Sequence, residues 1–127
     1  MNNHPDRVNS ILNSHFVSSL FDVNVIDYSA GKIVLGFHAR GPVFTGALGC
    51  IVDCVARLAA HESLGDCFVS EYELSSSNQP VVGDFVASAG IETTSDENAI
   101  YHCEINAVEN SVYKPIAESQ GTLMKIN

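Results

Sequence analysis

Apolar and polar residues alternate along most of the chain, with the period of two that is typical of half-buried β-strands. The clearest example is AIYHCEINAV, where Tyr101, Cys103 and Ile105 alternate with a mostly polar set. The sequence SAG between the first two runs indicates a hairpin turn, with Gly31 at positive φ. This pattern predicts six strands, over residues 21–28, 32–39, 67–78, 84–94, 98–109 and 114–126.

Two other segments place their apolar residues three and four positions apart, the spacing of a helix that buries one side. Residues 6–19 predict a short N-terminal amphipathic helix, and the stretch from Gly46 to about Glu62 predicts one long helix. No repeat, linker or change in composition divides the chain. We therefore expect an α+β fold in one domain, residues 1–127, with an antiparallel sheet around the long helix.

The long helix has two unlike sides when its residues are placed about 100° apart. One side is broad and bulky, and we expect it to pack on the concave face of the sheet. The other side is small and carries two charges, so we expect it to face a partner subunit or a cleft rather than open water. The bulky side holds Ala47, Leu48, Ile51, Val52, Val55, Leu58 and Ala59, and the small side holds Gly46, Gly49, Cys50, Asp53, Ala56, Arg57 and Ala60.

Asp53 lies in the middle of this apolar stretch and has two interpretations. Arg57 is four residues further on, so the two residues can form an intrahelical ion pair. An exposed pair of this kind contributes only about 0.2–0.5 kcal/mol, a weak reason to keep both charges in so apolar a segment. The second interpretation is a carboxylate held where water is limited, as a general base or nucleophile. The N–H groups of the preceding helical turn would then receive a developing oxyanion.

Composition narrows the classes of function. The 127 residues include 15 acidic and six basic ones, and the formal charge of −9 disfavours nucleic acid or anionic membrane as a partner. No apolar run approaches the roughly 20 residues that span a bilayer, and the N-terminus has no secretory signal, so the expected location is cytoplasmic. The four cysteines are then expected to be thiols. Cys50, Cys54 and His61 offer too few ligands for structural zinc, so we expect neither a metal nor a cofactor.

The segment HARGPVFTGALGCIVD carries a resemblance to a known family. The chain resembles the hotdog-fold acyl-CoA thioesterases in three features. Strands surround one apolar helix, a glycine-containing turn opens that helix, and an acid follows nine residues after the turn begins. Within that superfamily the chain resembles in particular the phenylacetyl-CoA and 4-hydroxybenzoyl-CoA thioesterase group. The segments QPVVGDFVA and KPIAESQGTLMKI are similar to the family's Pro-x-x-x-Gly-Asp turn and its closing strand. The resemblance covers most of the chain.

The resemblance implies a hydrolase for acyl thioesters of CoA or another pantetheine carrier, which works as a homodimer or homotetramer. Asp53 would be the general base or nucleophile, and the backbone N–H of Thr45, with that of Gly46, would bind the oxyanion. His38 takes the place of the family's asparagine and would orient water or substrate. The expected substrate contacts are Phe44, Arg57 and Arg40.

This sequence departs from the family at the triplet that opens the helix. Phe44 and Thr45 stand where the family has histidine and its first glycine. One alternative is therefore a noncatalytic acyl-binding or sensory module that kept the fold, and another is a purely structural dimerisation module. A serine hydrolase is disfavoured because no Gly-x-Ser-x-Gly sequence is present.

Overall fold

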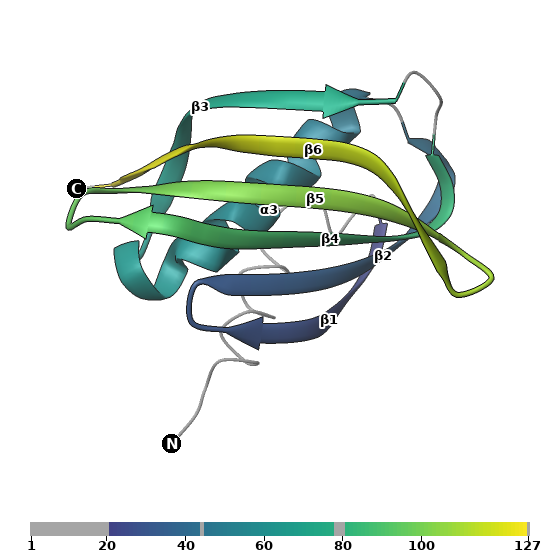
Figure 1. Ribbon diagram of the computed structural model, residues 1–127, viewed down its shortest axis with the longest axis horizontal. Helices are drawn as coiled ribbons and strands as arrows, with labels where there is room; N and C mark the ends of the chain where they lie inside the picture. The colour runs from purple at the N-terminus through teal and green to yellow at the C-terminus, as the bar shows by residue number, and fades with distance from the viewer. Residues whose placement is uncertain (1–20, 44, 78–80, 127) are drawn as a thin grey trace.

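The computed structural model describes residues 21–43, 45–77 and 81–126 of the protein. Six antiparallel strands form one sheet in the order β1-β2-β4-β5-β6-β3, and a single long helix lies against it (Figure 1). Among the described residues, no helix combines the length and the apolar character needed to span a membrane. The predicted N-terminal helix over residues 6–19 lies outside the described residues.

The strand and helix predictions are confirmed, with small changes at the ends. The elements are β1 (Phe21–Ser29), β2 (Lys32–Val43), α3 (Thr45–Leu64), β3 (Cys67–Ser76), β4 (Val81–Thr94), β5 (Asn98–Glu109) and β6 (Val112–Lys125). Gly31 has φ +76° in the first hairpin, as its turn requires. Gly65, with φ +71°, ends the helix by donating its N–H to the His61 carbonyl at 2.8 Å.

The turn between the last two strands is shorter than the sequence indicated. Asn110 and Ser111 both take positive φ, 51° and 66°, so two residues suffice to reverse the chain. Val112 and Tyr113 therefore belong to β6, where they pair with Glu109 and Val108. Two-residue hairpins with positive φ at both positions match the twist of the strands they join.

The core lies between α3 and the concave face of the sheet. Phe37 and Phe85 stack with ring centroids 5.3 Å apart, and Phe21 meets both rings edge-on at 5.8 Å. The inner face of β5 is the predicted one, because Tyr101, Cys103 and Ile105 are all buried. The buried helix residues include Leu48, Ile51, Val52, Val55, Leu58 and Ala59.

The small side of the helix is narrower than the sequence indicated. Ala56 and Ala60, which we assigned to it, are completely buried within the single chain, and so is Cys54 next to them. The sheet curves far enough around α3 for β2, β3, β4, β5 and β6 all to contact it, so much of the helix circumference is covered (Figure 1). What remains open is the stretch containing Gly46, Gly49, Cys50, Asp53 and Arg57.

Candidate active site

A cavity of about 400 Å³ lies between the first turns of α3 and the neighbouring strands. The helix contributes Gly46, Gly49, Cys50, Val52 and Asp53 to its wall. Because the wall is built from small side chains, a slender ligand can approach the helix backbone closely. The structure thus places the narrow remaining small side of α3 against a cleft.

The opposite wall comes from the sheet. Val69 and Tyr72 project from β3, and Tyr101 projects from β5. A methyl group at position 49 would lie 4.0 Å from the Tyr72 hydroxyl oxygen, so this ring leans toward the helix. Tyr72 is 56% exposed whereas Tyr101 is fully buried. The cavity thus has an open aromatic rim at the edge strand β3 and a closed aromatic floor further in.

Asp53 faces this cavity and is also held by its neighbour. Arg57 donates a hydrogen bond from Nη1 to Asp53 Oδ2 at 3.3 Å, one helical turn away. The side chains are 39% exposed for Asp53 and 40% for Arg57, so the carboxylate is neither sealed in the core nor fully in solvent. Both interpretations of Asp53 made from the sequence are therefore compatible with its position, because the carboxylate is paired with Arg57 and also lines the cavity.

The first turn of α3 lies at the same place. Thr45 is the first helical residue, and Gly46 lines the cavity. The first four N–H groups of a helix have no acceptor within that helix, and they carry the positive end of its dipole. This end of the cavity is thus suited to a group with negative charge. Phe44 and the side chains of Thr45 and Arg40 lie outside the described residues.

The structure does not bring His38 to this cavity within one chain. Its strand neighbours Phe37 and Ala39 point into the core, so the imidazole lies on the outer face of the sheet. There His38 Nδ1 lies 2.7 Å from Asp84 Oδ1, and both groups are exposed. The role that the family resemblance gives to His38 stays a prediction.

The thiols near the site differ in their environment. Burial, followed by the charge of Asp53, raises the pKa of Cys54 to about 12, and burial also raises the pKa of Cys67. These two groups therefore remain neutral thiols at physiological pH and are poor nucleophiles. Cys50 is partly exposed and lines the cavity. No group of three or more His, Cys, Asp or Glu side chains is placed to hold a metal ion within the described ranges.

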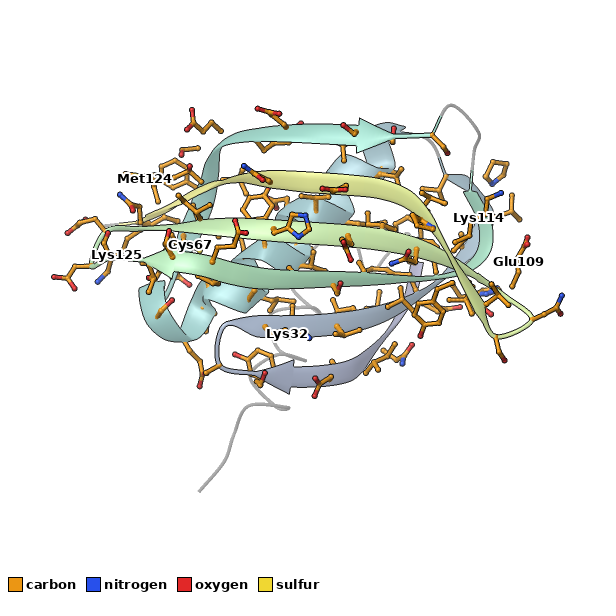
Figure 2. All side chains as sticks on the ribbon, viewed as in Figure 1. Lys32, Cys67, Glu109, Lys114, Met124 and Lys125 are labelled. Carbon is orange, nitrogen blue, oxygen red and sulfur yellow. The ribbon has the colours of Figure 1, made fainter. Side chains whose placement is uncertain are left out.

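The described lysines lie near the ends of strands, and none of them lines the cavity beside Asp53. Lys32 begins β2, Lys114 is in the arm of the β5–β6 hairpin, and Lys125 ends β6 (Figure 2). Of the cations whose side chains the structure describes, Arg57 is the one hydrogen-bonded to a residue of the cavity wall.

Sequence reasoning missed the sheet side of the cavity. In the sequence, Tyr101 belongs to the alternating pattern of one predicted strand and Tyr72 to the strand predicted over residues 67–78, but neither tyrosine was predicted to line a site. The alternation of β5 indicates the face on which Tyr101 lies, but β3 has a register shift between Val69 and Glu71, so alternation alone does not place Tyr72. Alternation also does not show that both strands lie beside the start of α3. That information requires the strand order, in which β3 pairs with β6 at the edge of the sheet.

Comparison with known proteins supports the fold. No protein-family model matches the sequence, and no curated protein sequence does. Solved structures do match, among them the PaaI protein of the Escherichia coli phenylacetic acid degradation operon, at TM-score 0.82 and 14% identity over 98% of this chain and 94% of that chain. A thioesterase family protein from Silicibacter pomeroyi has TM-score 0.80 and 14% identity, over 98% of this chain and 99% of the other.

A third match was solved with a ligand. It is a hypothetical thioesterase protein with coenzyme A from Streptococcus pneumoniae, at TM-score 0.77 and 12% identity, over 92% of this chain and 97% of the other. The sequence identities are low, so the likeness is one of fold. This protein therefore has the hotdog fold of thioesterase-superfamily proteins, and the resemblance inferred from the sequence is confirmed at that level.

Proposed function

We propose that this protein hydrolyses acyl thioesters of coenzyme A or of another pantetheine carrier. The observation that carries the proposal is Asp53, a carboxylate that faces a cavity of about 400 Å³ next to the first turn of a helix. A general base and an oxyanion site are the two parts that acyl transfer to water needs. The shared fold with thioesterase-superfamily proteins, one of them solved with coenzyme A, adds support.

The chemistry would begin with water held by the carboxylate of Asp53. As the water oxygen attacks the thioester carbonyl carbon, Asp53 takes its proton, and the carbonyl oxygen becomes an oxyanion. The backbone N–H groups of Thr45 and Gly46 would donate hydrogen bonds to that oxyanion. When the intermediate collapses, the carbon–sulfur bond breaks, and the thiolate receives the proton from Asp53 as the carboxylic acid product leaves.

Asp53 has a second route, as a nucleophile. It would then attack the carbonyl directly and form a mixed anhydride, which water hydrolyses in a second step. A single turnover in ¹⁸O-water detects the second route when water attacks the anhydride at the protein carbonyl. Attack by water labels the product acid, whereas attack by Asp53 with hydrolysis at the protein carbonyl leaves ¹⁸O in the Asp53 carboxylate.

The assembly proposed with this function is a homodimer, or a dimer of dimers. β3 lies at the edge of the sheet and forms part of the cavity rim. An edge strand offers backbone N–H and C=O groups to another strand, and Tyr72 on its inner side is 56% exposed in the single chain. A second copy placed along β3 would extend the sheet and cover this ring. Light scattering with size-exclusion chromatography measures the assembly directly.

The test of the function is hydrolysis of a panel of acyl-CoAs, followed by chromatography of the free CoA released. Asp53→Asn is the control because it keeps the shape of the side chain and removes the base. We expect the variant to lose about 100- to 10,000-fold in kcat, the usual contribution of a positioned general base. Equal turnover by the wild type and Asp53→Asn would show that Asp53 is not catalytic.

A noncatalytic acyl-binding module is the second candidate. The Arg57–Asp53 hydrogen bond of 3.3 Å favours it, because the carboxylate already takes part in an intrahelical ion pair. Phe44 and Thr45 in place of the family's histidine and glycine point the same way. Titration calorimetry with acyl-CoA that shows binding without release of CoA would support this candidate over the hydrolase.

A further inference from the structure

A row of three residues crosses the inner face of the sheet at the cavity. Tyr101 on β5 is paired with Gly121 on β6, and Gly121 is paired in turn with Tyr72 on β3. Two aromatic side chains thus flank a position that has no side chain at all. Because residue 121 is glycine, no third side chain stands between the two tyrosines in this row.

Gly121 is also required for the placement of Tyr101. A methyl group at position 121 would lie 2.9 Å from Tyr101 Cε2 and 2.9 Å from Tyr72 Cα, and closer still to the Glu71 carbonyl oxygen. Such contacts are shorter than van der Waals distance, so only glycine fits. The Tyr101 ring can therefore lie down over β6 rather than stand up into the cavity.

The Tyr101 hydroxyl fixes the ring from its far end. It donates a hydrogen bond to Ser119 Oγ at 3.0 Å, and Ser119 Oγ donates to the Glu73 carbonyl oxygen at 2.7 Å. Ser119 is buried, and burial raises the pKa of Tyr101 so that the phenol stays neutral. A ring held by packing on one face and by a buried hydrogen bond at its tip has little freedom to move aside for a ligand.

We propose that Tyr101 is the specificity-determining floor of the acyl pocket and restricts it to short acyl groups. This inference rests on the proposed function, because it takes the cavity beside Asp53 as the place where the acyl group lies. The cavity of about 400 Å³ is at the lower end of the roughly 300–1,000 Å³ typical of small-molecule sites. Because Tyr101 lines this cavity and its hydroxyl is held by Ser119, an acyl chain that enters beside Asp53 cannot extend past the ring.

Removal of the Tyr101 ring and removal of the Tyr72 ring should change the pocket in different ways, so the Tyr72 variant serves as the control for the Tyr101 variant. Tyr101→Ala opens the pocket inward, so longer acyl chains gain room. Tyr72→Ala removes the exposed rim, which opens the pocket sideways and weakens binding of all chain lengths alike. Tyr101→Phe keeps the ring and removes only its hydrogen bond to Ser119, so it retains the floor.

The experiment compares kcat/KM for straight-chain acyl-CoAs from acetyl to dodecanoyl in the wild type and these three variants. We expect the wild type to prefer short chains. Tyr101→Ala raises the ratio of octanoyl to butyryl activity by at least about tenfold, the scale of discrimination that a few methylenes provide in an apolar pocket. Tyr101→Phe and Tyr72→Ala keep the wild-type ratio within about twofold. Where Tyr101→Ala has no cooperative thermal transition, Tyr101→Leu replaces it.

A second readout does not depend on turnover. Cys50 lines the cavity, whereas Cys54, Cys67 and Cys103 are buried and serve as internal controls for alkylation by iodoacetamide. Non-hydrolysable S-alkyl-CoA thioethers of the same chain lengths should slow alkylation of Cys50, with the longest protecting chain shifted upward in Tyr101→Ala. Alkylation is read by mass spectrometry of the Cys50 peptide.

The outcomes separate the two proposals. If Cys50 protection depends on chain length and this dependence shifts in Tyr101→Ala, but no CoA is released, the role of Tyr101 is supported and the hydrolase proposal is overturned. If the protein hydrolyses acyl-CoAs with the same chain-length profile in wild type and Tyr101→Ala, the role of Tyr101 is overturned and the hydrolase proposal is supported. Neither hydrolysis nor protection by any thioether overturns both.

Discussion

Arg57 Nη1 lies 3.3 Å from Asp53 Oδ2, and the two side chains are exposed to almost the same degree, 40% and 39%. They are one helical turn apart, so their relative position is set by the helix itself. The pair lies at the border of the cavity, where water still reaches both groups. Its contribution to folding is therefore small, and its larger effect is on the orientation of the carboxylate.

Replacement of Arg57 by glutamine should separate these effects. We expect the free energy of unfolding to change by less than about 1 kcal/mol, because exposed ion pairs contribute about 0.2–1 kcal/mol. We expect kcat/KM for acyl-CoA to fall about tenfold, since a carboxylate that samples other rotamers is less often in position. Urea denaturation and steady-state kinetics measure the two quantities. Arg57→Lys keeps the charge but lacks the planar donor pair, so its kcat/KM should lie between those of the wild type and Arg57→Gln.

Gly121 is expected to tolerate no side chain. Gly121→Ala places a methyl group against Tyr101 and the backbone of Tyr72, so β6 and β3 must move apart, and overpacking of this kind costs about 1–3 kcal/mol. Gly90→Ala is the matched control in β4, because a methyl group there meets no atom within 4 Å. Denaturant midpoints should fall for Gly121→Ala and stay level or rise for Gly90→Ala. Equal midpoints for the two variants would contradict the close packing of the row.

Alkaline pH should destabilise the protein through its buried thiols. Burial raises the pKa of Cys54 and of Cys103 from 9.0 to about 12. The unfolded chain therefore loses these protons from pH 9 upward while the folded protein keeps them, so the free energy of unfolding falls between pH 9 and 12. Below pH 9 both states hold the protons, and the full stability is present.

The expected loss near pH 10 is about 1.4 kcal/mol for each of these two thiols. Cys54→Ala should remove its share of this pH dependence, although it lowers stability at every pH through the lost packing. Cys50→Ala is the control, since that side chain lines the cavity instead of the core. Urea midpoints at pH 8 and 10 give the slope, and an unchanged slope in Cys54→Ala would speak against a buried protonated thiol at that position.

The four cysteines should react at very different rates. Cys54, Cys67 and Cys103 are at most 2% exposed, whereas Cys50 is partly exposed in the cavity wall. A thiol reagent under native conditions should therefore show one fast-reacting thiol per chain, because the other three react only when the protein opens. Cys50→Ser should abolish the fast phase and leave the slow one. A fast phase that survives this substitution would place the reactive thiol elsewhere.

The sequence by itself determined the elements of this fold and the position of its central acid. Alternation along AIYHCEINAV and its counterparts gave six strands, and the three- and four-residue spacing after Gly46 gave the long helix. Both are local patterns with periods of two and 3.6 residues, so they can be read without knowledge of the neighbours. The same spacing placed Asp53 on the small side of the helix, which the structure sets against a cavity.

Tertiary structure alone decided what stands opposite Asp53. Tyr101, Gly121 and Tyr72 are far apart along the chain and meet because β5, β6 and β3 are adjacent in the sheet. The extent to which the sheet wraps the helix likewise decided that Ala56 and Ala60 are buried while Cys50 is not. Strand order and register depend on the free energy of the whole core rather than of any one segment, so periodicity within a segment carries no record of them.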